Sequence, residues 1–154
     1  MRAFTLIEIL VVIGMIGILA STVLVAINPL HQFAQARNTQ RISNVQTLLN
    51  AIGNRLADNK GIFPGGTNCT LDIPQAATLM GSSKFDIRLC LVPTYISELP
   101  VDPSTGTNSC TTDTCSAGAY ETGYTVSINP SHRVTVCAPE SVHDGMDAPY
   151  CLSR

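Results

Sequence analysis

Residues 4–27 read FTLIEILVVIGMIGILASTVLVAI, an almost uninterrupted apolar stretch in which Glu8 is the only charged residue. At about 1.5 Å per residue, an α-helix of this length is about 36 Å long and crosses a hydrocarbon core near 30 Å. The stretch is longer than the roughly 7–15 apolar residues of a cleaved secretory signal, and only Arg2 precedes it as a basic residue. The sequence therefore predicts a membrane-spanning helix over residues 4–27.

Glu8 is the unusual residue of this stretch. An ionisable side chain at mid-bilayer costs roughly 2.5–3.5 kcal/mol and normally marks a functional position. Glu8 lies in the first turns of the expected helix, where the positive end of the helix dipole partly offsets that cost. This placement explains why the carboxylate is tolerated but not why it is present, since a plain membrane anchor has no need of it.

The chain beyond residue 27 is polar, and its first part predicts a second helical segment over residues 28–60. Asn28-Pro29 is expected to interrupt the first helix, because proline cannot donate a hydrogen bond to the preceding turn. Gly61 then occupies the C-cap position. The segment is amphipathic, since apolar residues recur at spacings of three and four. This stripe comprises Ile42, Val45, Leu48, Leu49, Ile52 and Leu56.

Residues 61–154 predict a small globular head. Alternating apolar and polar residues favour a β-hairpin at about residues 120–137, and a third strand is expected at residues 150–153. Residues 62–118 are rich in Pro, Gly, Ser and Thr and are expected to be mostly loop, with short helices at residues 74–80 and 93–97. The expected fold is α+β, with a long N-terminal helix whose amphipathic half packs on a small antiparallel sheet and whose apolar half protrudes.

All six cysteines lie in the head, and an even number in a small loop-rich region indicates an oxidising compartment. Fifteen pairings are possible. Absence of a CxxC motif argues against a zinc ribbon or a thioredoxin-like site. Proximity along the chain favours the pairs Cys110–Cys115, Cys137–Cys151 and, by elimination, Cys69–Cys90.

The run AFTLIEILVVI, residues 3–13, resembles the processing site and opening helix of type IV prepilins and of the related pseudopilins. The resemblance implies cleavage between Ala3 and Phe4 by a prepilin peptidase, N-methylation of the new Phe4 amine, and an assembly role for Glu8, the fifth residue after the cut. The leader, residues 1–3, is short, and Ala3 stands where glycine is commoner in the family. Residues 31–40 are polar on every side, so this part of the second helical segment is expected to face other subunits while the amphipathic part packs on the head. This arrangement resembles the lollipop shape of pilins.

Elementary electrostatics supports that assembly role. A cationic amine at Phe4 and a carboxylate at Glu8 attract far more strongly at low dielectric than in water. If the two charges belong to adjacent subunits, polymerisation neutralises a carboxylate that each isolated subunit leaves without a cationic partner. Gly14 and Gly17 let neighbouring helix backbones approach closely, and together with Pro29 they are the expected flexible points.

The function expected from the resemblance is that of a major pilin, the self-polymerising subunit of a type IV pilus (fimbrium) in adhesion, twitching motility or DNA uptake. Its expected partners are the prepilin peptidase and methylase and the pilus assembly ATPase with its platform machinery. The prepilin is expected in the inner membrane with a cytoplasmic N-terminus, and the mature subunit in an extracellular filament. A pseudopilin of a type II secretion system is the first alternative, and a membrane-anchored extracytoplasmic binding domain is the second.

No arrangement of residues indicates an enzyme, since no catalytic triad, GxSxG or paired-carboxylate motif is present. The net charge of −2 does not favour a polyanion partner, and the sequence has no basic patch of the kind that binds nucleic acid. Contact with DNA through Arg88 or Arg133 is left as an open alternative. No cofactor is expected. Asp102 and Asp113, with Asp144 and Asp147, are weak calcium candidates, and solvated loop carboxylates are the alternative interpretation.

Overall fold

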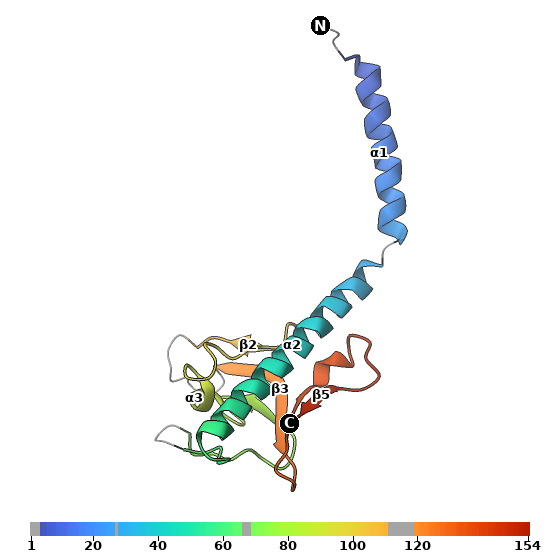
Figure 1. The fold of residues 1–154 in the computed structure, drawn as a ribbon. Helices are drawn as coiled ribbons and strands as arrows, with labels where there is room; N and C mark the ends of the chain where they lie inside the picture. Colours follow the sequence, from blue (N-terminus) through green and yellow to red (C-terminus); the bar gives the residue numbers. More distant parts are fainter. Residues whose placement is uncertain (1–3, 27, 66–68, 111–118) are drawn as a thin grey trace. The chain divides into compact units, whose positions relative to one another are not determined.

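The computed structural model describes residues 4–26, 28–65, 69–110 and 119–154. The chain divides into two compact units, Met1–Phe33 and Ala34–Arg154 (Figure 1).

The first unit contains helix α1, Leu6–Ala26. Its segment Leu6–Val23 has a mean hydropathy of 2.5 and no buried residue, so this helix is long and apolar enough to cross a membrane. Gly14 and Gly17 lie inside the helix, and a Cβ added at either position would meet no atom within 4 Å. Among the described residues of this unit, none covers the apolar surface of Leu6–Val23.

Helix α2, Pro29–Asp58, begins at the step where the sequence predicts an interruption. Pro29 suits the first helical position, because its missing N–H would have no partner there and its φ is already helical. Asn28 precedes it, and its Oδ1 accepts a hydrogen bond from the His31 N–H at 3.4 Å. At the other end Lys60 and Gly61 both have positive φ, and the Gly61 N–H bonds to the Leu56 carbonyl at 2.7 Å. These features mark a regular start and end of the second helix.

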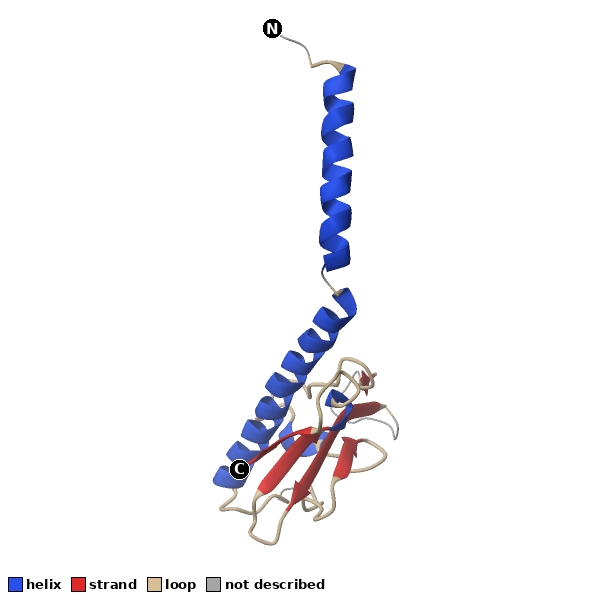
Figure 2. Ribbon diagram, turned by 90° about the vertical axis from the view of Figure 1, so that its right-hand side faces the viewer, coloured by secondary structure: helices blue, strands red, loops and turns tan. Residues whose placement is uncertain are grey.

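In the second unit α2 packs on an antiparallel sheet, and the predicted α+β class is confirmed (Figure 2). Neighbouring strands follow the order β1-β3-β4-β5, and β2 also pairs with β3. The predicted hairpin of β3 and β4 and the predicted third strand β5 are both present. The strands are β1 Thr78–Gly81, β2 Thr107–Asn108, β3 Tyr120–Ile128, β4 Val134–Ala138 and β5 Tyr150–Ser153.

The two short helices predicted in the loop region are wrong as placed. Thr78–Gly81 is strand β1, because pairing with β3 in the sheet overrides local preference. A short helix, α3, spans Arg88–Leu91 and ends before Pro93 rather than beginning there. Val92 is extended, as expected for a residue that precedes proline. A further 3₁₀ turn, η1, covers Pro139–Ser141.

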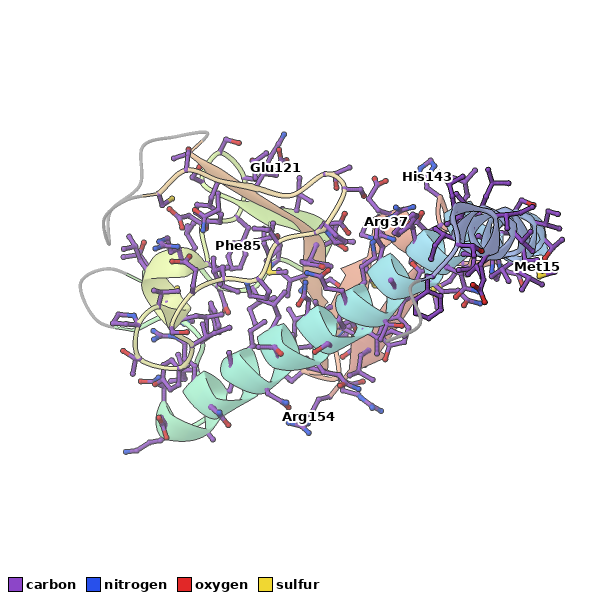
Figure 3. All side chains as sticks on the ribbon, turned by 90° about the horizontal axis from the view of Figure 1, so that it is seen from above. Met15, Arg37, Phe85, Glu121, His143 and Arg154 are labelled. Carbon is purple, nitrogen blue, oxygen red and sulfur yellow. A yellow bond between two sulfur atoms is a disulfide. The ribbon has the colours of Figure 1, made fainter. Side chains whose placement is uncertain are left out.

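The core lies between α2 and the sheet and includes Val45, Leu49 and Ile52 from the predicted stripe. Phe85 lies among these side chains, with its ring centroid 6.2 Å from that of Phe63 (Figure 3). The remaining fully buried apolar residues include Leu48, Met80, Ile87, Leu91, Tyr120, Tyr124, Val126 and Val136.

Disulfide bonds are present in the head, as the sequence predicts. Cys69–Cys90 lies in the core, and Cys137–Cys151 joins residues that face each other on β4 and β5. The expected pair Cys110–Cys115 falls outside the described residues, because Cys115 belongs to residues 111–118.

One edge of β3 is paired with other strands only at its two ends, and a loop occupies the part between them. Strands β2 and β4 pair with the two ends of this edge, at Tyr120–Glu121 and Thr125–Ile128. Between them the Asp102 N–H donates to the Thr122 carbonyl at 2.7 Å. Gly123 allows this close approach, because it has a φ of +79° and a Cβ there would lie 2.6 Å from the Cβ of Asp102.

Gly123→Ala is therefore expected to destabilise the head more than Gly145→Ala. Gly145 also has a positive φ, of +91°, but a Cβ there would meet no atom within 4 Å. Gly145→Ala should cost about 1–2 kcal/mol for the left-handed backbone, and the clash with Asp102 should cost Gly123→Ala about 1–3 kcal/mol more. Urea unfolding of the full chain in detergent measures both losses, and equal losses would refute the proposed close approach.

Candidate functional site

The first candidate site is the start of α1, where Thr5 and Glu8 contact each other. The Glu8 N–H donates to Thr5 Oγ1 at 3.3 Å. In return, Glu8 Oε2 accepts from the Thr5 N–H and the Thr5 hydroxyl, each at 3.5 Å. This reciprocal pattern is a capping box, in which a Thr before the helix and a Glu three residues later satisfy each other's backbone N–H groups.

The capping box gives Glu8 a role within a single subunit, which the sequence analysis missed. The Thr-x-x-Glu spacing of residues 5–8 was the available signal. Both contacts to the carboxylate are long, and Glu8 remains exposed, as does Phe4 with 79% of its surface accessible. The geometry therefore leaves the carboxylate open to an external cation. Ala3, the other residue of the expected cleavage site, lies outside the described residues.

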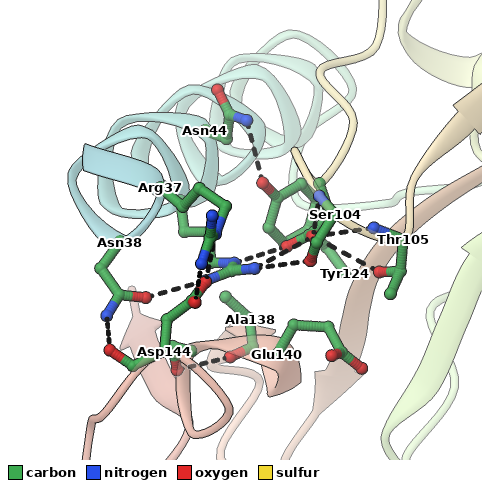
Figure 4. A network of polar contacts seen from close by, with 12 residues as sticks. Arg37, Asn38, Asn44, Ser104, Thr105, Tyr124, Ala138, Glu140 and Asp144 are labelled. Carbon is green, nitrogen blue, oxygen red and sulfur yellow. Dashed lines mark hydrogen bonds and ion pairs between the residues drawn. The ribbon is translucent and has the colours of Figure 1, made fainter. Parts of the chain in front are cut away.

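The second candidate site is a buried ionic network between α2 and two loops of the head (Figure 4). Its centre is Arg41, which is 1% exposed. The Arg41 Nε donates to Asp102 Oδ2 at 2.6 Å, and Nη2 donates to Asp102 Oδ1 at 3.2 Å. Nη2 also donates to Ser104 Oγ at 2.8 Å, and Nη1 donates to the Asp144 carboxylate. One guanidinium thus binds two carboxylates from different loops.

Asp102 is fully enclosed by donors. Its Oδ1 also accepts from the Ser104 N–H at 2.9 Å, the Ser104 hydroxyl at 2.7 Å and the Thr105 N–H at 3.2 Å. Burial by itself raises the pKa of this carboxyl, but the hydrogen bonds from Arg41 and Ser104 outweigh burial and lower the pKa to about 2. Asp102 is therefore ionised at neutral pH although its side chain is buried.

Asp144 extends the network towards the start of α2. The Arg37 Nε donates to Asp144 Oδ2 at 2.8 Å, and Arg37 Nη2 contacts Oδ1. The Asn38 amide donates to the Asp144 carbonyl at 3.0 Å. These bonds from Arg37, together with those from Arg41, hold the pKa of the Asp144 carboxyl well below its usual range.

Asn44 and Tyr124 add a further link between α2 and the sheet. The Asn44 amide donates to the Tyr124 hydroxyl at 2.9 Å and to the Val101 carbonyl at 3.2 Å. Burial raises the pKa of Tyr124 to about 12, so its hydroxyl stays protonated at neutral pH.

These contacts correct two expectations. Residues 31–40 were expected to face other subunits, and this is wrong for Arg37 and Asn38, which bind the subunit's own head. For the exposed residues of the stretch, such as Gln35 and Gln40, it stays a prediction. Asp102 and Asp144 were interpreted as calcium candidates or solvated carboxylates, but both are ion-paired. Four-residue spacing of Arg37 and Arg41, which places two guanidiniums on one helix face, was the sequence signal for this site.

Within the described residues, no group of three or more His, Cys, Asp or Glu side chains is placed to hold a metal ion. Asp113, the other leading calcium candidate, lies outside the described residues. Asp102 has its two carboxylate oxygens occupied by Arg41, Ser104 and Thr105.

Comparisons of this chain with protein-family models, with curated proteins and with solved structures give no match. Function is therefore inferred from the residues and geometry of the chain itself.

Replacing Arg41 with Met is expected to lower the free energy of unfolding by about 3–5 kcal/mol, because the change leaves Asp102 buried and without its counter-charge. Arg37→Met is the matched control. The Arg37 side chain is 37% exposed, so solvent screens its ion pair and its loss should cost much less than the loss of Arg41. Urea unfolding at pH 7 measures both values. A loss for Arg41→Met no greater than that for Arg37→Met would contradict the central role of Arg41.

Acid should destabilise the head through Asp102. Its pKa is about 2 in the folded protein and near 3.8 when unperturbed, so its stabilising contribution is complete above about pH 4 and is lost as the pH falls towards 2. Asp102→Asn should start from a lower stability and lose less of it between pH 4 and 2 than the parent chain does. Unfolding free energies measured across this range give the two slopes, and identical slopes would contradict the assignment.

Proposed function

We propose that this chain is the structural subunit of a filament of the type IV pilin kind, which polymerises through α1. The observation that carries the proposal is Glu8, a lone carboxylate five residues after the Ala3-Phe4 junction in an otherwise apolar helix. Helix capping needs only a hydrogen-bond acceptor at this position, whereas a contact between neighbouring subunits also accounts for the negative charge.

The exposed surface of α1 supports this proposal. Within their own unit the apolar side chains of Leu6–Val23 are exposed, so they require lipid or other apolar surfaces around them. A shallow apolar hollow follows one side of the helix start, lined by Phe4, Thr5, Leu6, Ile9, Leu10 and Ile13. Such a surface suits lipid before assembly and the helices of neighbouring subunits afterwards.

The head is compatible with a pilin fold. A helix that follows the apolar segment packs on an antiparallel sheet, and disulfides close the loops around it. Such bonds typically stabilise small secreted domains by about 2–4 kcal/mol each. They suit a subunit that functions outside the cytoplasm.

The proposed life of the subunit has two stages. The prepilin resides in the inner membrane, where a prepilin peptidase cleaves before Phe4 and a methylase modifies the new amine. Assembly ATPase and platform machinery then move the subunit into an extracellular filament. Its proposed roles are adhesion, twitching motility or DNA uptake.

Within the filament, the proposed partner of Glu8 is the Phe4 amine of a neighbouring subunit. The capping box provides the competing account, in which Glu8 serves only to start its own helix. The two roles depend on different properties of the side chain. Capping needs a hydrogen-bond acceptor, which Gln also supplies, whereas pairing with an amine needs the negative charge.

Glu8→Gln and Thr5→Ala separate these roles. We expect Glu8→Gln to keep the cap and insert into the membrane normally, but to yield at least about tenfold fewer filaments, because a tenfold change needs only about 1.4 kcal/mol. Thr5→Ala removes the cap but keeps the charge and should assemble nearly normally. The measurement is the amount of subunit in sheared filaments relative to the membrane fraction, in a host with a type IV pilus machinery.

Abundant filaments from Glu8→Gln would sink the charge-pairing proposal. Equal losses from both variants would assign Glu8 to helix capping alone. Mass spectrometry of the parent filaments adds an independent check, with an expected subunit that begins at Phe4, carries one added methyl group and lacks six cysteine hydrogens. An uncleaved protein that stays in the membrane would instead favour a membrane-anchored domain.

A further inference from the structure

The two described disulfides differ in how far their cysteines are exposed to solvent. Cys69 and Cys90 are each 3% exposed and belong to the hydrophobic core. Cys151 is exposed and Cys137 is half-buried. Since thiol–disulfide exchange requires a thiolate to reach a sulfur atom, the second bond is far more accessible to a reductant than the first.

The register of the sheet explains this exposure. Val136 and Leu152 face each other on β4 and β5, and both pack towards the core. Side chains alternate along a strand, so Cys137 and Cys151 point to the opposite face of the sheet. The next pair on that face is Thr135 and Ser153, whose hydroxyl oxygens lie 2.8 Å apart. The disulfide therefore lies on the polar outer face of the sheet.

The strand pair has supports that do not involve the disulfide. Val134 and Arg154 exchange two backbone hydrogen bonds, each of 2.9 Å. At the other end the Tyr150 N–H donates to Ser141 Oγ at 2.9 Å. Between the two strands, Asp144 fixes the connecting segment to α2 through its bonds with Arg37 and Arg41. Opening the disulfide therefore leaves the two sulfur atoms side by side on paired residues.

We propose that Cys137–Cys151 is a reversible thiol–disulfide exchange site, which a dithiol oxidoreductase opens and closes while the head remains folded and Cys69–Cys90 remains closed. A thiolate of the reduced enzyme attacks Sγ of Cys151, the more exposed residue of the pair. The S–S bond breaks, and Cys137 leaves as a thiolate that takes up a proton. The second thiol of the enzyme then attacks the mixed disulfide and releases Cys151 as a thiol. Two electrons pass from the dithiol to the pair, and the reverse steps restore the bond.

This site is independent of filament formation, because every residue that carries it belongs to the head. Its failure would leave the proposed role of Glu8 untouched, and failure of filament assembly would leave the exchange site untouched.

The first test is graded reduction of the full chain in detergent. The protein is equilibrated with increasing dithiothreitol and alkylated, and each cysteine-containing peptide is quantified by mass spectrometry. Cys137 and Cys151 should become labelled together, at a reductant concentration at least about tenfold below that needed for Cys69 and Cys90. Labelling of Cys69 and Cys90 at the same or a lower concentration would overturn the proposal.

The second test asks whether the head stays folded when the bond is absent. We expect the double variant Cys137→Ser/Cys151→Ser to keep the protease resistance and near-ultraviolet circular dichroism of the parent head. Cys69→Ser/Cys90→Ser is the matched control and should lose both, since it removes a bond from the core. An unfolded or protease-sensitive Cys137→Ser/Cys151→Ser protein would also overturn the proposal.

Discussion

The ion pair of Arg41 and Asp102 is the interaction on which the rest of the head depends. Both side chains are almost completely removed from water, a transfer that costs several kcal/mol for each charge unless hydrogen bonds replace the lost solvation. Here Ser104 and Thr105 supply the remaining donors. The pair joins α2 to the loop that occupies the edge of β3 between β2 and β4, and Gly123 gives that loop the space to approach.

The ionic network also complements the apolar stripe of α2. Hydrophobic burial is non-directional, so the stripe alone fixes which face of the helix is covered but constrains its rotation and axial position less closely. Arg41 donates in fixed directions to carboxylates of two loops, and each bond restricts the position of the helix. Arg37 and Asn38 carry this contact beyond the end of the stripe. Arg37 and Asn38 of the polar stretch are therefore part of the interface between α2 and the head.

Helix α1 differs from α2 in how its apolar surface is covered. It is apolar on all sides and, within its own unit, has no cover over Leu6–Val23. Its exposed apolar surface is unfavourable in water, so it needs apolar surroundings. The proposed filament supplies them through other copies of the same helix. Glu8 has a role both in the single subunit and in the proposed filament. It caps its own helix in the single subunit, and it is the proposed charge partner of a neighbouring amine in the filament.

Features that depend on local pattern could be predicted from the amino-acid sequence. Apolar length predicts α1, spacings of three and four predict the buried face of α2, and alternation predicts the hairpin and strand β5. The capping box at Thr5 and Glu8 was also readable from its spacing. The contacts of Asp102 and Asp144 with Arg41 depend on the folded chain, because these residues are 61 and 103 positions from Arg41 in the sequence. The strand conformation of Thr78–Gly81 also depends on the folded chain, since the pairing partner β3 lies about forty residues away. The local spacing of apolar residues predicts which face of a segment is buried. The partners of buried charges and of edge strands depend instead on which distant segments the fold brings together.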